Sequence, residues 1–316
     1  MANAPVPPTT LWRYMGEKFM PTEQQAAVIG AEPGPLLVVA GAGAGKTETM
    51  ASRVVWLVAN GFVRPEEVLG LTFTRKAAQE LGKRIRMRLE KLAADEQLVR
   101  RLDPTGALAK NLTAIAPTVS TYDSYAGNLI REYGLLVPVE PDARLITDAE
   151  LHAIAWDVVS NHGGALLDGV GENPAMETVV DTLLGLITNV GNEMFPYPRL
   201  GEEADAFVAN VAGLPRGKRQ GEAYNQTVQK WVNRQQLRRA YADLALELGS
   251  ELRERGVVTF NEQMSVAAQM AAEHPAVGAS QRDRFRVVML DEYQDTSHAQ
   301  RVLLRSLFGE NRDNPG

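Results

Sequence analysis

Residues 36–50 read LLVVAGAGAGKTETM: four apolar residues, an alternation of alanine and glycine, and then Lys46-Thr47 at the start of a helical pattern. The apolar run 36–39 predicts a short buried strand, and residues 46–60 predict a helix that Gly61 is placed to stop. Small residues between a strand and a helix allow successive backbone N–H groups to surround an anion, and the helix N-terminus adds partial positive charge. The segment therefore predicts a phosphate-binding loop in an α/β fold.

This loop assigns roles to individual residues. Lys46 is expected to reach the β- and γ-phosphates of a nucleoside triphosphate, and the Thr47 hydroxyl to bind Mg²⁺. The alternative is a Gly/Ala-rich turn that only resembles such a loop, but the preceding strand, the following helix and the Gly-Lys-Thr ending favour phosphate binding. The first position holds alanine where the strict pattern has glycine. The predicted nucleotide-binding residues are Ala40, Gly41, Ala42, Gly43, Ala44, Gly45, Lys46 and Thr47.

A second acidic motif lies near the other end of the chain. The apolar run Val287–Leu290 is followed directly by Asp291 and Glu292, and ligand sites of open α/β sheets form at the carboxyl ends of such strands. Asp291 is expected to hold Mg²⁺ through coordinated water, and Glu292 to orient and deprotonate the attacking water. By itself the pair is equally typical of a solvated strand end; together with the phosphate loop it predicts catalysis by Glu292, Asp291 and Lys46.

Composition bounds the class of protein. The 316 residues carry a formal net charge of -6, 45% are hydrophobic and 23% are charged, as in ordinary globular proteins. An acidic chain does not coat nucleic acid by bulk charge, but a local basic groove stays open. Because there is no cysteine, disulfides and thiolate metal sites are excluded. No signal peptide and no run of about 20 apolar residues is present, so we expect a cytoplasmic protein without a membrane contact.

Strand and helix patterns alternate along the first part of the chain and again at its end. Residues 68–74, 118–122 and 286–290 are the further strand candidates, and residues 75–92 and 124–133 the further helices, after a flexible lead-in over residues 1–10. Residues 147–255 show almost only helical patterns. This order predicts an α/β domain with a parallel sheet, helices on both faces and a helical insertion.

The segment Asp291-Glu292-Tyr293-Gln294-Asp295-Thr296 resembles the signature of the UvrD/Rep/PcrA group of superfamily 1A DNA helicases. Four other segments agree with that group in order: residues 22–28 are similar to its glutamine motif, 71–78 and 120–124 to motifs that contact single-stranded DNA, and 256–262 to a later Asp-Phe segment. The alanine at position 40 is the group's own form of the loop. Asp123 departs from the pattern, because Thr-Phe-His is usual where this chain has Thr-Tyr-Asp.

The resemblance implies a RecA-like domain 1A in two parts, residues 11–145 and 256–316, around a helical subdomain 1B at residues 146–255. It implies that Gln24 reads the adenine edge and that the chain is the ATP- and DNA-binding part of an ATP-dependent helicase or translocase. Direction 3′→5′, a role in DNA repair or recombination, contact with single-stranded and duplex DNA, and a partner helicase–nuclease subunit of the actinobacterial AdnB type are also implied. The DNA-binding residues it points to are Thr72, Phe73, Thr74, Arg75, Thr121 and Tyr122.

Two further surfaces carry open alternatives. Lys83, Arg84 and Arg88 belong to a basic stretch over residues 75–101, and each is equally expected to contact DNA or to lie on a solvated helix face. Aromatic rings such as Phe73 and Tyr122 offer stacking surfaces for bases. Trp231 could touch duplex DNA, but we expect it to pack in the core.

The group's second RecA-like domain, which brings arginine fingers worth about 10³–10⁵ in rate, is expected to follow this stretch of chain. These 316 residues alone are therefore expected to bind MgATP weakly and neither to hydrolyse it well nor to unwind DNA. Two alternatives stay open: a different P-loop ATPase, and a non-enzymatic DNA-binding or regulatory module.

Overall fold

The computed structural model describes residues 5–41, 43–114, 116–137, 143–162, 174–215, 217 and 224–309. The chain divides into two compact units. Unit 1 comprises Met1–Tyr125 and Pro275–Thr296, and unit 2 comprises Ala126–His274 and Ser297–Gly316. Each unit is described by itself below.

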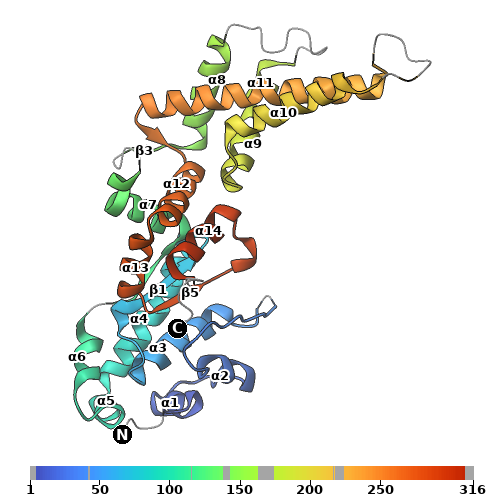
Figure 1. The fold of residues 1–316 in the computed structure, drawn as a ribbon. Coiled ribbons are helices and arrows are strands. Elements are labelled where there is room, and N and C mark those ends of the chain that lie inside the picture. Colours follow the sequence, from blue (N-terminus) through green and yellow to red (C-terminus); the bar gives the residue numbers. More distant parts are fainter. Residues whose placement is uncertain are drawn as a thin grey trace. The chain divides into compact units, whose positions relative to one another are not determined.

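Unit 1 is built on a three-stranded parallel sheet (Figure 1). Its strands are β1 (Val68–Thr72), β2 (Thr118–Thr121) and β5 (Val287–Leu290), in the order β2-β1-β5. All three strand predictions are confirmed, with ends one or two residues shorter than expected. Leu71 lies opposite Ser120 on one side and Leu290 on the other, so the three strands end at the same edge.

Helices cover the sheet. Every residue of β1 is buried, which is the pattern of a strand enclosed on both faces. Helix α4 (Arg75–Ala94) packs against β1 and β2, and α3 (Lys46–Ala59) packs against α4. The apolar stripe predicted for α4 is confirmed, because its buried residues are Ala78, Leu81, Ile85, Leu89 and Leu92.

Helix α3 ends as its sequence predicts. Gly61 has a φ of 72°, and its N–H donates to Val58 O while the Phe62 N–H donates to Leu57 O. This pair of hydrogen bonds is the Schellman motif, which needs a left-handed residue after the helix and therefore favours glycine.

The predicted strand at residues 36–39 is wrong. In the described part of the chain this segment pairs with no strand, and Leu37 and Val39 are 79% and 88% exposed. An apolar run predicts burial, but a β-strand also needs a partner strand with which to form hydrogen bonds, and that partner lies elsewhere in the sequence. The segment instead runs as irregular backbone into the phosphate loop.

Within the predicted flexible lead-in, residues 8–10 lie in a helix and Val6 is hydrogen-bonded to α3 and to the residue after it. Helix α1 (Pro8–Tyr14) begins with Pro8 at its first position, where a missing N–H costs nothing. The Val6 carbonyl accepts a 2.7 Å hydrogen bond from the buried Trp56 indole, and the Val6 N–H donates to Asn60 Oδ1 at 2.7 Å. Residues 1–4 lie outside the described residues.

In the described part of the chain, five other helices contribute to unit 1 or begin in it. Helix α2 (Glu23–Ile29) starts with a capping box between Thr22 and Gln25. The remaining ones are α5 (Glu96–Leu102), α6 (Ala107–Ala114), α13 (Pro275–Arg284) and, across the boundary at Tyr125, α7 (Tyr122–Tyr133).

Unit 2 is helical, as predicted for residues 147–255, with a two-residue parallel pairing of β3 (Arg144–Leu145) and β4 (Val257–Val258). Helices α10 and α11 lie side by side (Figure 1). Trp231 of α11 is 52% exposed, so its predicted core packing is wrong.

None of the helices in the described ranges is long and apolar enough to cross a membrane. The helices are α8 (Asp148–Asn161), α9 (Met176–Asn192), α10 (Tyr197–Gly213), α11 (Gln226–Glu254), α12 (Phe260–Glu273) and α14 (His298–Phe308).

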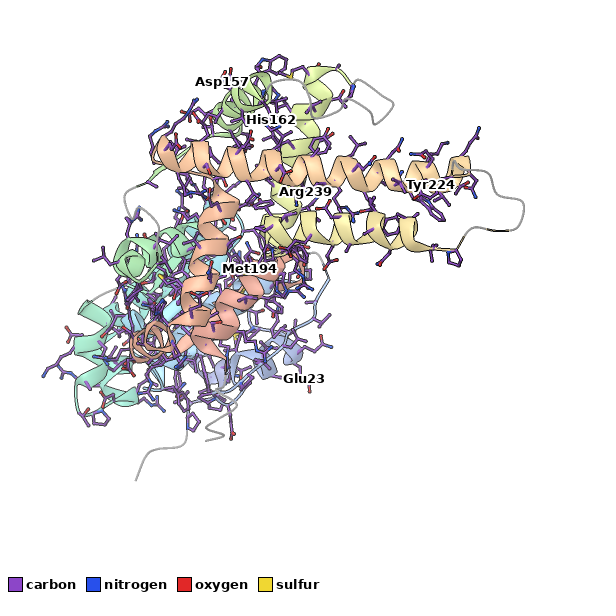
Figure 2. All side chains as sticks on the ribbon, turned by 45° about the horizontal axis from the view of Figure 1, so that its top comes forward. Glu23, Asp157, His162, Met194, Tyr224 and Arg239 are labelled. Carbon is purple, nitrogen blue, oxygen red and sulfur yellow. The ribbon has the colours of Figure 1, made fainter. Side chains whose placement is uncertain are left out.

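Helix α9 ends with the same motif as α3 but without the glycine. Met194, labelled in Figure 2, has a φ of 53°, and its N–H donates to Gly191 O while the Phe195 N–H donates to Val190 O. A left-handed residue with a Cβ costs about 1–2 kcal/mol.

We predict that Met194→Gly is more stable to chemical unfolding than Met194→Ala by about 1 kcal/mol, since both lose the side chain and only glycine relieves the strain. Equal stability of the two variants would contradict this account.

Candidate nucleotide and nucleic-acid site

The carboxyl ends of the three strands place the predicted motifs along one edge of unit 1. Thr72 ends β1, Thr121 ends β2, and Asp291 follows β5 directly. The Asp291 N–H donates to Leu71 O at 2.9 Å, which continues the ladder one residue beyond β5. This edge is where parallel sheets bind ligands.

The phosphate loop has the backbone that an anion cradle requires. Gly43 and Gly45 have φ values of 75° and 80°, in the left-handed region that a side chain disfavours. Gly45 is the N-cap of α3, so the free N–H groups of that helix begin at the loop. Ala42 lies outside the described residues.

Lys46 connects the loop to the acidic motif. It is the first residue of α3, and its Nζ donates to the carbonyl of Ala40 at 3.3 Å and lies 3.8 Å from Glu292 Oε1. Because both side chains are partly exposed, this pair contributes little to stability. Its significance is geometric: the fold brings together a lysine and a glutamate that the sequence places at opposite ends of the chain.

Asp291 is a buried carboxylate, 8% exposed. Burial raises the pKa of its carboxyl above the ordinary value, and the neighbouring charge of Glu292 raises it further. The Glu292 N–H, which donates to Asp291 Oδ1 at 3.1 Å, and the charge of Lys46 act in the opposite direction. Such a group is stabilised in its charged form by a bound cation.

Glu292 occupies a strained backbone conformation. With φ 51° and ψ 39°, it is one of two non-glycine residues at positive φ among the described residues, the other being Met194. Gln294 donates a short hydrogen bond to Glu292 Oε2 and a second one to Asp295 Oδ2 at 3.2 Å. Strain of this kind persists only where surrounding contacts hold it, and it clusters at functional sites.

The residues present fit a magnesium–triphosphate group. Mg²⁺ is usually held by one or two protein oxygens together with substrate phosphates and water. Thr47 is the second residue of α3, directly after Lys46, and Asp291 directly follows β5, and both side chains carry oxygen atoms of the kind that Mg²⁺ prefers. Within the described ranges, no cluster of three or more His, Cys, Asp or Glu side chains could hold a metal ion.

The glutamine motif contributes a contact that the sequence did not predict. Gln24, the predicted adenine reader, is exposed. Its neighbour Gln25 donates from Nε2 to Ala44 O in the phosphate loop at 3.1 Å. The buried Arg53 of α3 donates to Val28 O and Ile29 O at 3.0 Å each, near the end of α2. These bonds fix α2 beside the loop. The feature of the sequence that could have indicated this contact is the pair of adjacent glutamines in a capping pattern.

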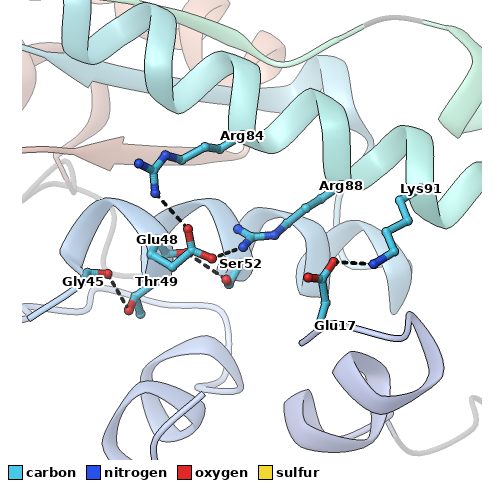
Figure 3. Close-up of polar contacts among 8 residues, drawn as sticks. All are labelled: Glu17, Gly45, Glu48, Thr49, Ser52, Arg84, Arg88 and Lys91. Atoms are coloured by element: carbon cyan, nitrogen blue, oxygen red, sulfur yellow. Dashed lines mark hydrogen bonds and ion pairs between the residues drawn. The ribbon is translucent and has the colours of Figure 1, made fainter. Parts of the chain in front are cut away.

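Two of the three cations singled out on α4 bind a carboxylate next to the loop (Figure 3). Arg84 lies 2.9 Å from Glu48, in the first turn of α3, and Arg88 pairs with the other oxygen of the same carboxylate. Arg88 also lies over the Trp12 ring, and burial lowers the pKa of its guanidinium. Both arginines therefore join α4 to α3, while Lys83 lines a cavity of about 530 Å³ beside them.

The segment after β1 is partly accessible. Thr72 is buried, Phe73 is half-buried, and Thr74 and Arg75 are exposed. Thr74 caps α4 by accepting a hydrogen bond from the Ala77 N–H at 3.1 Å. Arg75 thus stands at the start of a helix with its guanidinium in solvent.

The residues at the end of β2 and directly after it are less accessible than a DNA contact requires. Thr121 is buried and its hydroxyl donates to Ser124 Oγ at 2.9 Å. Tyr122 is 2% exposed, so its ring offers no surface on which a base could stack. Its ring packs against Phe73 with centroids 4.9 Å apart, and its hydroxyl donates to the Asp291 carbonyl at 3.2 Å. Burial, followed by the nearby Asp291 charge, raises the pKa of this hydroxyl and keeps it protonated.

Asp123 supplies a pH-dependent prediction. Burial raises the pKa of its carboxyl above the ordinary 3.8, so the folded state binds its proton more tightly than the unfolded state does. Stability contributed by this group is therefore lost as pH rises from about 3.8 through the raised folded pKa. We predict that Asp123→Asn melts at a higher temperature than the native chain at about pH 7, and that the difference narrows toward about pH 4.

Asp103 provides a control of opposite sign. Hydrogen bonds from Thr105 and Leu108 lower the pKa of its carboxyl, so Asp103→Asn is expected to melt below the native chain at neutral pH. A lower melting temperature for Asp123→Asn at neutral pH would show that the Asp123 carboxylate is stabilised rather than strained by its surroundings.

Comparison with known proteins agrees with this geometry. A family model described as the UvrD/REP helicase N-terminal domain matches residues 20–313. The chain is 28% identical over 297 residues to the ATP-dependent DNA helicase UvrD1 of Mycobacterium leprae (strain TN), covering 93% of this chain and 31% of the relative.

Two other relatives give the same result. The protein of that name in Mycobacterium tuberculosis (strain ATCC 25618 / H37Rv) is 29% identical over 290 residues, covering 92% of this chain and 30% of the relative. The ATP-dependent DNA helicase PcrA of Staphylococcus aureus (strain NCTC 8325 / PS 47) is 26% identical over 288 residues, covering 91% and 31%. The chain spans about a third of the length of these curated relatives.

Proposed function

Because the chain belongs to the UvrD/REP helicase N-terminal domain family, we propose that it is the ATP- and single-stranded-DNA-binding portion of an ATP-dependent DNA helicase or translocase. The observation that carries the proposal is the 3.8 Å approach of Lys46 Nζ to Glu292 Oε1 at the carboxyl ends of the parallel strands. A phosphate-binding lysine and a candidate base meet there, beside a segment with exposed polar and basic groups.

The roles at the nucleotide follow from charge and position. Backbone N–H groups of the loop and the Lys46 ammonium would bind the β- and γ-phosphates, because both are donors at the positive end of α3. Thr47 and Asp291 would hold Mg²⁺, which supplies neutralisation of the phosphate charge when bound. Glu292 would orient the attacking water and accept its proton.

The roles at the nucleic acid use the segment after β1. Arg75 would pair with a backbone phosphate, Thr74 would donate a hydrogen bond, and the half-buried Phe73 ring would present an edge or face to a base. The buried Tyr122 and Thr121 are placed to support this segment rather than to contact DNA themselves.

The finer expectations stay predictions. They are the 3′→5′ direction, the repair or recombination pathway, contact with duplex DNA, a partner helicase–nuclease subunit, and the division into 1A and 1B at residues 145 and 255. Weak nucleotide binding and slow turnover by these 316 residues alone belong to the same group.

The division of roles at the nucleotide can be tested by titrating a fluorescent ATP analogue with Mg²⁺. Lys46→Ala is expected to weaken binding at least ~30-fold, about 2 kcal/mol, because it removes the positive charge that pairs with the terminal phosphates. Glu292→Gln is expected to bind within about threefold of the native chain and to slow single-turnover hydrolysis, since the amide keeps the shape of the side chain but cannot accept the proton.

Lys91→Ala serves as the control, because Lys91 pairs with Glu17 at 3.0 Å and has no proposed role at the nucleotide. It should leave the affinity unchanged. Equal loss of binding in Lys46→Ala and Glu292→Gln would contradict the proposed roles.

The nucleic-acid contact is tested by fluorescence anisotropy with a labelled oligothymidylate. Arg75→Ala is expected to weaken binding and to reduce the slope of log affinity against log salt by about 0.7, the value for one phosphate contact on a single strand. Arg100→Ala removes a guanidinium of similar exposure on α5, paired only loosely with Glu96 at 3.7 Å, and is the matched control. An unchanged slope in Arg75→Ala would remove this residue from the interface.

A further inference from the structure

The Tyr122 hydroxyl joins the two halves of the site. It lies in unit 1 with its ring enclosed, and its one hydroxyl donates to the main-chain carbonyl of Asp291 at 3.2 Å. A buried hydroxyl needs a partner, and here the partner is the backbone between the two proposed catalytic carboxylates.

That backbone unit is held at both ends. The peptide between Asp291 and Glu292 has its oxygen bound by Tyr122 and its N–H bound by Asp291 Oδ1 at 3.1 Å. Glu292, which follows it, sits at φ 51°. A left-handed glutamate is relieved by rotation of this peptide, and the two hydrogen bonds oppose that rotation. These two hydrogen bonds therefore hold the orientation of the peptide that precedes Glu292.

The other side of Tyr122 faces the proposed DNA contact. Its ring packs against Phe73 at 4.9 Å with an interplanar angle of 52°. Phe73 is half-buried and is followed by the exposed Thr74 and Arg75. A base that stacks on Phe73 moves or fixes that ring, and the ring is in direct contact with the one that carries the Asp291 hydrogen bond.

We propose that Tyr122 is a positioning residue that couples single-stranded DNA at Phe73 to the orientation of Glu292 at the nucleotide. The proposal rests on the proposed function, since it requires both ligands to bind unit 1. The link is short: one ring contact, one hydroxyl and one peptide. Coupling between two sites is measured as the factor by which one ligand changes the affinity for the other, and factors of about 5–150 are typical.

The experiment measures the dissociation constant of a fluorescent ATP analogue with Mg²⁺, with and without saturating oligothymidylate, for the whole chain. In the native chain the ratio of the two constants is expected to reach about fivefold or more. Tyr122→Phe removes only the hydroxyl; each ligand alone is expected to bind within about threefold of native, and the ratio to fall below about twofold.

Tyr125→Phe is the matched control. Tyr125 lies three residues further along α7, is also buried, and its hydroxyl donates to Gln281 Oε1 at 2.9 Å. Tyr125→Phe removes an equivalent buried hydrogen bond away from Asp291. It should therefore lower stability about as much as Tyr122→Phe does, and keep the native ratio of the two dissociation constants. Melting temperatures of the three proteins establish that the comparison is made between folded chains.

The outcomes separate the two levels of the proposal. A native ratio near one, or a Tyr122→Phe ratio equal to the native ratio, overturns the coupling and leaves ATP and DNA binding intact. Equal loss in Tyr122→Phe and Tyr125→Phe also overturns it, because any buried hydroxyl would then serve. A native chain that binds neither ligand overturns the proposed function and the coupling together.

Discussion

Parallel pairing of β1 with β2 and β5 is the constraint on which the rest of unit 1 depends, because strands in register must end at a common edge. β1 lies between the other two, is buried throughout, and places Leu71 opposite Ser120 and Leu290. Phe73, Tyr122, Asp291 and Glu292 each lie one or two residues beyond those positions. A one-residue change in the register of β5 would place the Asp291 side chain on the opposite face of the sheet, since side chains alternate along a strand. The helices that cover β1 therefore position the chemistry as well as the core.

The edge concentrates features that oppose stability. Asp291 is a buried carboxyl, Glu292 is left-handed, and Gly43 and Gly45 hold the loop in a conformation closed to other residues. Surrounding contacts hold each of them: the Glu292 N–H at Asp291, the Tyr122 hydroxyl at the intervening peptide, and Gln25 at the loop. Buried polar groups that are fully bonded give a defined geometry, and partly bonded ones leave it mobile. Removal of the Tyr122 hydroxyl alone is therefore expected to change the geometry at Glu292.

The sequence predicted elements whose pattern is local and missed those that depend on distant partners. The stripe of α4, the glycine end of α3 and the strands at 68, 118 and 287 follow from periodicity and turn chemistry, and the structure confirms them. Residues 36–39 have strand composition but no ladder, and Trp231 has core composition but an exposed ring. The approach of Lys46 to Glu292 was inferred from motif order, whereas the contacts of Gln25, Arg53 and Tyr122 depend on side-chain directions that no spacing encodes. Whether Tyr122 faces a base or a backbone carbonyl is decided by packing.

The central claim is that one sheet edge binds both ligands, and hydrogen–deuterium exchange measured by mass spectrometry tests it most directly. MgATP is predicted to slow exchange in peptides covering residues 41–47 and 291–294, and oligothymidylate in peptides covering residues 72–77. The helices of unit 2 from α8 to α11 should change little with MgATP. Protection by MgATP that is absent from residues 41–47, or confined to unit 2, would contradict the account.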